Sequence, residues 1–360
     1  MRILHATKDF AFSTTVFGEG RLEKGKDYYT FGKFAKDVAA MGAGVILEGE
    51  PRVQDFSPEA TRDLRPGSRI LLLHSGGYGD TITVGIFLAL MMRRFGVNFD
   101  VCGDPEKHAY ILKPMGLEGD CLSYPPLLEE VESYDYLLRE LAAFAANPRA
   151  LLEESPLKIL CRAFGLPLQM DGIGFRVPRE TSKRLELPQS KRIRVGINFD
   201  SNGAVKSYPE ELQALLVDSL LDLGFELFFF GTRPLSDEIE PGTELLHDLT
   251  GRTRIPELAA LLDQMDLVLG VDSFVAHLSG ILGKKTIVLL STTGEDYFDH
   301  YPAVFSRASK IECAPCFSTG DTCPLGYPRC RAFYHESIQP GILLQAMIRE
   351  ITRMYGYSHG

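Results

Sequence analysis

Tryptophan is absent from this 360-residue sequence, so aromatic stacking must come from its 22 phenylalanines and 14 tyrosines. Long apolar runs are also absent, and none approaches the ~20 residues that a membrane-spanning helix needs. The first residues, MRILHATKDFAFS, have no long apolar core after a basic start, so we expect no signal peptide and a cytoplasmic location. The net charge of −10 argues against nucleic acid as a partner, although it is compatible with a local basic pocket for a small phosphate.

Three signatures of nucleotide-binding enzymes are missing as well. The sequence contains neither the G-x-G-x-x-G dinucleotide fingerprint nor the Gly-Lys-Ser/Thr of a P-loop, and it shows no Asp-x-Asp motif for a metal-bound diphosphate. The overall composition, 45% hydrophobic and 24% charged, is that of an ordinary globular protein and excludes a disordered, collagen-like or coiled-coil chain. The length is sufficient for two or three domains.

The sequence predicts an α/β protein with several parts. Residues 1–66 form a small module of mostly short strands with a helical piece at Phe34–Met41, and the polar, proline-containing stretch 51–68 is typical of a linker. Two similar-sized α/β domains follow, joined near residues 182–192, with a cleft between them. We assign the first domain to 67–185, the second to 190–337 with a Cys-rich loop at 311–331, and the C-terminal helix to 338–360.

Strands and helices alternate in both domains, which predicts parallel sheets with right-handed crossovers. The predicted strands are Arg69–His74, Asn98–Cys102, Arg194–Phe199, Glu226–Phe230, Leu267–Val271 and Thr286–Leu290. The predicted helices are one after Asp80, then Leu127–Ala146, Pro156–Phe164, Glu210–Leu223, Pro256–Met265, Ser273–Leu282 and Ile338–Met354. On Glu210–Leu223 the buried face is predicted to carry Leu212, Leu215, Leu216 and Leu223.

A glycine-rich turn, Gly76-Gly77-Tyr78-Gly79-Asp80, separates a strand from a helix. Its backbone N–H groups suit an anion or a sugar ring. Asp80 is a carboxylate that can take a proton from a substrate hydroxyl. The plainer alternative is that Asp80 only caps the helix.

Two further loops follow buried strands, where ligands gather in parallel sheets. In the first, Ser201 can hydrogen-bond phosphate oxygens and Lys206 brings a positive charge, unless it is an ordinary exposed lysine. In the second, Asp272 or Ser273 caps a helix whose first turn can bind an anion. His277 lies four residues after Ser273 and can reach a phosphate or a ribose, or it is simply a satisfied core histidine.

Four cysteines, Cys313, Cys316, Cys323 and Cys330, lie within eighteen residues of a loop rich in proline and glycine. Four thiolates suit structural zinc or mononuclear iron, and a filled shell leaves no open position for catalysis. Free thiols and disulfides are the alternatives. The remaining cysteines, Cys102, Cys121 and Cys161, are scattered, and we interpret them as small buried side chains.

Together these segments resemble glycosyltransferase family 9, the ADP-heptose heptosyltransferases. The resemblance extends over about residues 69–340. It rests on the glycine-rich turn, the Lys206 loop, Leu249–Thr253 before a helix, and Val271–Leu278 continuing through Gly283–Thr286 into a strand. It implies a GT-B fold of two Rossmann-like domains and an inverting transfer without a catalytic metal. The acceptor would be bound mainly by the first domain and the nucleotide sugar by the second.

The resemblance also implies roles for individual residues. Asp80 matches the catalytic base, and Gly76, Gly77, Tyr78 and Gly79 form the loop on the acceptor side. Lys206 matches the diphosphate-binding lysine. The full set expected to bind the nucleotide sugar is Ser201, Lys206, Gly231, Asp272, Ser273, Phe274 and His277. Phe274 stands where a glycine is usual.

The Cys-rich loop and the added N-terminal module look like the autotransporter branch of the family, which modifies serine hydroxyls of a protein and carries a four-cysteine iron site. The expected partners are therefore a nucleotide sugar, with ADP-heptose as the first candidate, and an acceptor that is either a lipopolysaccharide core or a protein. The sequence leaves open whether the chain forms a homo-oligomer. Two other functions stay open: an inactive GT-B binding or scaffold protein, suggested by Phe274, and a nucleotide-sugar epimerase.

Overall fold

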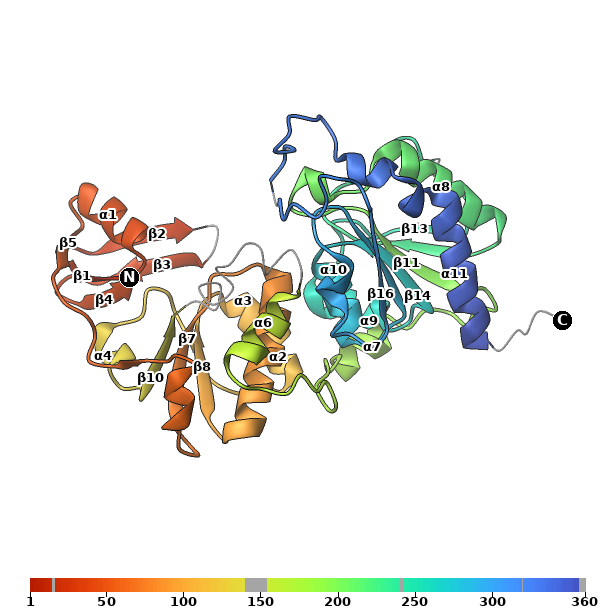
Figure 1. Ribbon diagram of the computed structural model, residues 1–360. Helices are drawn as coiled ribbons and strands as arrows, with labels where there is room; N and C mark the ends of the chain where they lie inside the picture. Colours follow the sequence, from red (N-terminus) through yellow and green to blue (C-terminus); the bar gives the residue numbers. More distant parts are fainter. Residues whose placement is uncertain (15–16, 140–153, 240–242, 319, 356–360) are drawn as a thin grey trace. The chain divides into compact units, whose positions relative to one another are not determined.

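The computed structural model describes residues 1–14, 17–139, 154–239, 243–318 and 320–355 (Figure 1). The chain divides into two compact units, one of Met1–Ala146 with Ile159–Gln169 and one of Asn147–Lys158 with Met170–Gly360. Within the described ranges, none of the helices has the length and apolarity needed to cross a membrane.

A small β-rich module begins the first unit, as the sequence predicts. Its central strand β1 (Arg2–Ala6) pairs antiparallel with β4 (Asp27–Thr30) and β5 (Gly44–Leu47), while β2 (Phe10–Thr14) and β3 (Gly18–Leu22) form a hairpin. Helix α1 (Gly32–Ala40) is the predicted helical piece. Apolar side chains of the strands and of α1 make the module's own core, which includes Leu4, Leu22 and Ala35.

The rest of the first unit is a parallel sheet in the order β6-β10-β7-β8-β9. Its strands are β6 (Gln54–Asp55), β7 (Arg69–Leu73), β8 (Asn98–Cys102), β9 (Cys121–Leu122) and β10 (Tyr136–Arg139). Its helical elements are η1 (Glu59–Arg62), α2 (Tyr78–Phe95), α3 (Pro105–Lys107), η2 (His108–Leu112), η3 (Lys113–Met115), α4 (Leu128–Val131) and the part of α6 (Pro156–Ala163) from Ile159 on.

Two predictions for this unit are wrong. The predicted helix Leu127–Ala146 is a single turn, α4, followed by the strand β10; residues 140–146 lie outside the described residues. Leu137 and Leu138 are fully buried because β10 pairs with β7 on one side and β6 on the other, and this pairing overrides the local helical pattern. The stretch 51–68 is more than a linker, because β6 and η1 lie in it.

The second unit is built on a six-stranded parallel sheet in the order β13-β12-β11-β14-β15-β16. Its strands are β11 (Arg194–Asn198), β12 (Glu226–Phe229), β13 (Leu246–Asp248), β14 (Leu267–Val271), β15 (Thr286–Leu290) and β16 (Val304–Ala308). Its helical elements are α7 (Arg179–Arg184), η5 (Ala204–Lys206), α8 (Glu210–Asp222), α9 (Ile255–Leu262), α10 (Phe274–Ile281), η6 (Glu295–Phe298), η7 (Arg331–Tyr334), η8 (Glu336–Ile338) and α11 (Pro340–Tyr355).

Helices cover both faces of this sheet: α8 and α11 pack together on one face, and α9 and α10 lie on the other (Figure 1). The predicted inner face of α8 is partly wrong, because Leu215 and Leu223 are 58% and 48% exposed. The buried residues of α8 are Leu212, Leu216, Val217 and Leu220. Both sets follow the helical period, but the buried face is rotated about the helix axis, away from Leu215 and toward Val217.

The strand order creates a switch point at β11. The chain passes from β11 outward to β12 and β13, and then returns to β14 on the other side of β11. In open parallel sheets, ligands bind outside the carboxyl ends of the strands at such a point. The residues that follow β11 and β14 therefore form the candidate ligand site.

Candidate functional site

Asn198, the last residue of β11, joins three strand ends. Its side-chain Nδ2 donates to the carbonyl of Phe230 at 3.0 Å and to Asp200 Oδ1 at 2.5 Å, and its Oδ1 accepts from the Ser273 hydroxyl at 2.7 Å. The asparagine is 1% exposed. It fixes the loops after β11, β12 and β14 relative to one another. No sequence motif marks it; the available signal is a polar residue at the end of a buried strand.

Ser273 occupies the N-cap position of α10 but does not cap the helix with its side chain, because its hydroxyl donates to Asn198. The first turn of α10 therefore presents its amide groups and its positive dipole end at the switch point. This arrangement suits an anionic ligand.

Lys206 and Asp272 form an ion pair with 2.9 Å between Nζ and Oδ2. Their side chains are 17% and 8% exposed, so Lys206 is not an ordinary exposed lysine. The Ser201 hydroxyl donates to the Asp272 carbonyl at 2.9 Å. The structure thus brings Ser201, Lys206, Asp272 and Ser273 together around the carboxyl ends of β11 and β14.

Gly231 lies where the chain passes very close to Asp200. A Cβ at this position would lie 2.1 Å from Asp200 Oδ1, and the backbone has a φ of +142°, which favours glycine. Asp200 Oδ2 accepts from the backbone N–H of Thr232 at 3.0 Å and from that of Arg233 at 3.1 Å. Gly231 therefore allows Asp200 to hold the loop that follows β12.

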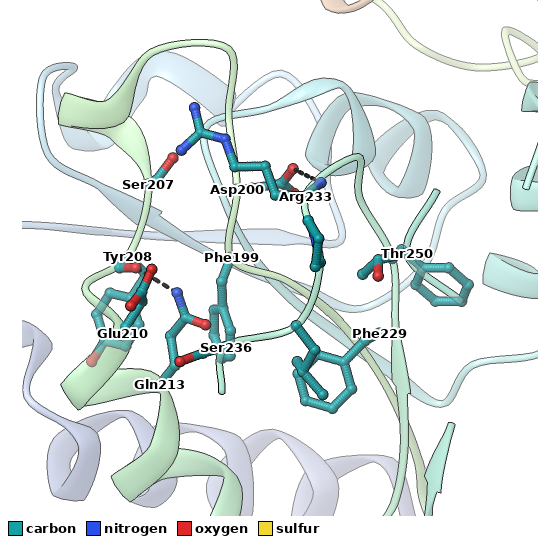
Figure 2. Close-up of a pocket in the computed structure, with 13 residues that line it drawn as sticks. Phe199, Asp200, Ser207, Tyr208, Glu210, Gln213, Phe229, Arg233, Ser236 and Thr250 are labelled. Atoms are coloured by element: carbon teal, nitrogen blue, oxygen red, sulfur yellow. Dashed lines mark hydrogen bonds between the residues drawn. The ribbon is translucent and has the colours of Figure 1, made fainter. Parts of the chain in front are cut away.

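A pocket of about 100 Å³ opens beside this loop (Figure 2). Phe199, Tyr208 and Phe229 supply its apolar wall, and Asp200 and Arg233 are among its polar residues. In Figure 2 the Arg233 side chain extends toward Ser207.

His277 is buried in α10, and its Nδ1 hydrogen-bonds the Tyr301 hydroxyl at 3.1 Å. The centre of its ring lies 4.6 Å from that of Phe298. Burial, together with the nearby charge of Lys206, lowers the pKa of His277 to about 3. The imidazole is therefore neutral at neutral pH, so it can offer a hydrogen bond to a ligand but no positive charge.

In the first unit, the helix α2 begins at Tyr78, so the second half of the predicted glycine-rich turn is helical. Asp80 is thus the third residue of the helix, and from there its side chain caps the helix start, as in the plainer alternative. Its Oδ2 accepts from the Gly77 N–H at 2.8 Å, and the residue is exposed, so a substrate can reach it. At Gly76, a Cβ would lie 2.7 Å from His74 Cε1 and 2.8 Å from Asp80 Cβ, which explains the glycine.

His74 and Lys107 flank this turn, and neither could be singled out from the sequence because no motif marks them. His74 Nε2 hydrogen-bonds the Thr81 hydroxyl at 2.9 Å, and burial with the nearby charge of Lys107 lowers its pKa to about 4. Lys107 is only 8% exposed, and its ammonium donates to the Gly76 carbonyl at 2.9 Å.

The four clustered cysteines lie in a loop of the second unit. Burial raises the pKa of the Cys330 thiol. Within the described ranges, however, no three His, Cys, Asp or Glu side chains are close enough to ligate one metal ion.

The Cys-rich loop contacts the loops around Lys206. The N–H groups of Cys316 and Phe317 donate to the Thr292 carbonyl, just after β15, at 3.0 and 2.7 Å. Asp321 Oδ1 accepts from the N–H of Ala204, the first residue of the η5 turn that carries Lys206, at 3.1 Å. The Cys-rich loop therefore supports the turn on which Lys206 lies.

Comparison with known protein families now identifies the chain. A family model described as glycosyltransferase family 9 (heptosyltransferase) matches residues 142–325, more than half of the sequence. The chain belongs to glycosyltransferase family 9. It is therefore a glycosyltransferase, and the family resemblance seen in the sequence is confirmed. No curated protein sequence matches it.

Solved structures of glycosyltransferases confirm the fold. E. coli ADP-heptose lps heptosyltransferase II is 15% identical with a TM-score of 0.57, and the match covers 80% of this chain and 99% of that one. The iron-containing dodecameric glycosyltransferase TibC from enterotoxigenic E. coli H10407 is 12% identical with a TM-score of 0.62, covering 82% and 81%.

A structure of TibC in complex with ADP-D-beta-D-heptose is 11% identical with a TM-score of 0.60, covering 98% of this chain and 92% of that one. At these identities the likeness establishes the fold alone. The predicted GT-B-type α/β architecture with a small N-terminal β module is thereby confirmed.

Proposed function

We propose that this family 9 glycosyltransferase moves a heptose or a related sugar from ADP-heptose to a hydroxyl group of a glycan or protein acceptor. The main support for this proposal is the largely buried ion pair of Lys206 and Asp272. It lies beside the start of α10, which no side chain of its N-cap residue caps, at the switch point of a parallel sheet. A diphosphate needs a positive charge and amide donors in one place, and these groups supply both. ADP-heptose is chosen because the names of two of the similar structures include it or its close equivalent.

The donor diphosphate would lie against Lys206 and the first turn of α10. Ser201 holds the Asp272 main chain, and Asp272 holds the ammonium of Lys206 in place before the donor arrives. As the donor binds, its phosphate oxygens share or replace the carboxylate as partners of Lys206. Neutral His277, Ser273 and Phe274 border the same turn, and Gly231 shapes the neighbouring loop that leads to the pocket.

The transfer is a single displacement. Asp80 takes the proton from the acceptor hydroxyl, whose oxygen forms a bond to the anomeric carbon as the bond from that carbon to the phosphate oxygen breaks. The departing ADP keeps the electron pair, and Lys206 with the helix dipole stabilises its charge. Attack from the face opposite the leaving group inverts the anomeric configuration, and no second carboxylate takes part.

The four cysteines have the donor set of a structural iron or zinc site, and their side chains would have to move closer together to hold one ion. Cys313, Cys316, Cys323 and Cys330 would hold the ion. A metal bound there would cross-link a loop that is poor in apolar anchors and stabilise only the folded state. It takes no part in the transfer itself.

Calorimetric titration with ADP-heptose, UDP-glucose and GDP-mannose tests the donor. Tight binding of ADP-heptose alone is the expected result, while preference for another nucleotide sugar would overturn this part of the proposal.

Incubation with ADP-heptose and either a lipopolysaccharide-core oligosaccharide or a serine-containing protein then tests the acceptor. NMR of the product should show the inverted anomer; retention would exclude the single displacement, and a changed sugar nucleotide without acceptor would indicate an epimerase.

A further inference from the structure

One peptide group of the glycine-rich turn is held at both ends by opposite charges. The carbonyl of Gly76 accepts from the ammonium of Lys107 at 2.9 Å. The N–H of Gly77, which belongs to the same peptide group, donates to Asp80 Oδ2 at 2.8 Å. The cation lies at the negative end of the peptide dipole and the carboxylate at the positive end, so both contacts favour the same orientation of this peptide.

The side chain of Lys107 reaches the turn from the short helix α3, which follows β8. It is 8% exposed, and the removal of an ammonium from water costs several kcal/mol unless partners compensate. The partners are the Gly76 carbonyl, Asp104 with its Oδ2 at 3.7 Å, and the Tyr78 ring, whose centre lies 5.2 Å from Nζ. Two of these three belong to the glycine-rich turn, so the ammonium is directed there.

The two glycines make such a support necessary. Gly76 and Gly77 have no Cβ to restrict rotation, so the peptide between them can turn over more easily than an ordinary one. Rotation of that peptide would point the Gly77 N–H away from Asp80 and would release the carboxylate. The close contact of Gly76 with His74 and Asp80 excludes larger residues that would stiffen the turn.

We propose that Lys107 is a positioning residue for Asp80 and acts through the Gly76–Gly77 peptide. The inference rests on the proposed role of Asp80 as the base. Lys107 fixes the peptide, the peptide fixes Oδ2 of the carboxylate, and the carboxylate is thereby held in the orientation that accepts the acceptor's proton. In the proposed role Lys107 acts only through this peptide and not directly on the donor or the reacting atoms.

The test measures ADP release from ADP-heptose with whichever of the two acceptors the wild type uses. Lys107→Met should lower kcat by roughly 10–100-fold, as expected when a catalytic group is misplaced by about 1 Å. The KM for ADP-heptose and the calorimetric affinity for ADP should stay within about twofold, because the proposed role of Lys107 is to position Asp80 and not to bind the donor. Lys107→Arg should restore part of kcat. Lys113→Met, a change at an exposed lysine of the same unit, is the control and should leave kcat unchanged.

A double-mutant cycle separates positioning from a general structural effect. In an Asp80→Asn background, Lys107→Met should change kcat by less than about twofold, because the group that it positions is already lost. An equal further loss in that background would overturn the inference, as would wild-type kcat in folded Lys107→Met. Should the Met variant not fold, Lys107→Gln, which keeps a hydrogen-bond donor, serves in the same cycle. Full activity of Asp80→Asn alone would instead refute the base assignment in the proposed function.

Discussion

Replacement of Lys206 by methionine is the perturbation whose consequences the structure defines best. The variant keeps the aliphatic stem and removes the ammonium that lies 2.9 Å from Asp272. A hydrogen bond to a charged group contributes about 1.5–3 kcal/mol, so ADP affinity should fall by roughly 10–100-fold. The loss should lie at the upper end of this range, because the uncompensated Asp272 carboxylate then repels the phosphates.

The same change also affects folding. Asp272 is 8% exposed, and loss of the partner of a buried ion pair typically costs about 3–5 kcal/mol. Because Lys206 is partly exposed, a smaller cost is expected here. The double variant Lys206→Met with Asp272→Asn removes the orphaned charge, so it should recover much of this stability while ADP affinity remains low.

Calorimetric titration with ADP and urea unfolding measure the two effects separately. Lys191→Met is a suitable control, because Lys191 is exposed and precedes β11 at the amino edge of the sheet. ADP affinity within about twofold of wild type in folded Lys206→Met would refute the placement of the diphosphate. Wild-type affinity in the double variant would show that Asp272 repulsion, and not loss of the lysine contact, caused the effect.

Three more predictions concern the second unit and the buried groups of both units. Gly231→Ala places a Cβ 2.1 Å from Asp200 and should destabilise the protein. The control is Gly283→Ala, at a position with positive φ and open space around it, where a cost of ~1 kcal/mol is expected. Thermal unfolding of the two variants should show the larger loss of stability for Gly231→Ala. Burial lowers the pKa values of three histidines from an ordinary value of 6.5 to about 4 for His74, about 3 for His277 and about 3 for His300. Below pH 6.5 the unfolded chain therefore takes up more protons than the folded chain. Urea unfolding should show a free energy of unfolding that is constant above about pH 7.5 and falls toward pH 5 by on the order of 2 kcal/mol per histidine. An equal free energy of unfolding at pH 7.5 and pH 5 would contradict this. Metal analysis of protein purified without added metal should find about one iron or zinc per chain, the stoichiometry of a single tetrathiolate site, whereas no metal with four titratable thiols, or two disulfides, would exclude the site.

Most strands and helices could be predicted from the sequence, because short apolar runs and helical periods are local properties. The exceptions depend on tertiary pairing. Strand β10 is a strand because β6 and β7 lie on either side of it, and no local pattern in residues 127–146 contains that information. Similarly, the spacing of leucines in α8 suggests that Leu215 is buried, but α8 packs through Leu216 and Leu220 instead.

For the site, the sequence indicates which loops follow buried strands, and motif residues such as Lys206 and Ser273 indeed lie together at the switch point. It does not show which side chain contacts which. The pairing of Lys206 with Asp272 joins residues far apart in the chain, and so does the contact between Lys107 and Gly76. Such contacts depend on the strand order, which spacing along the chain does not encode.

A single-turnover experiment decides whether Asp80 is the base of a heptosyl transfer from ADP-heptose. Wild type and Asp80→Asn, each in excess over ADP-heptose and with the acceptor present, are followed by mass spectrometry of the acceptor and by ADP release. We expect stoichiometric addition of heptose by the wild type and a rate lower by ~10²–10⁴ in the variant, with ADP affinity unchanged. A rate within a few-fold of wild type in Asp80→Asn would show that another group takes the proton.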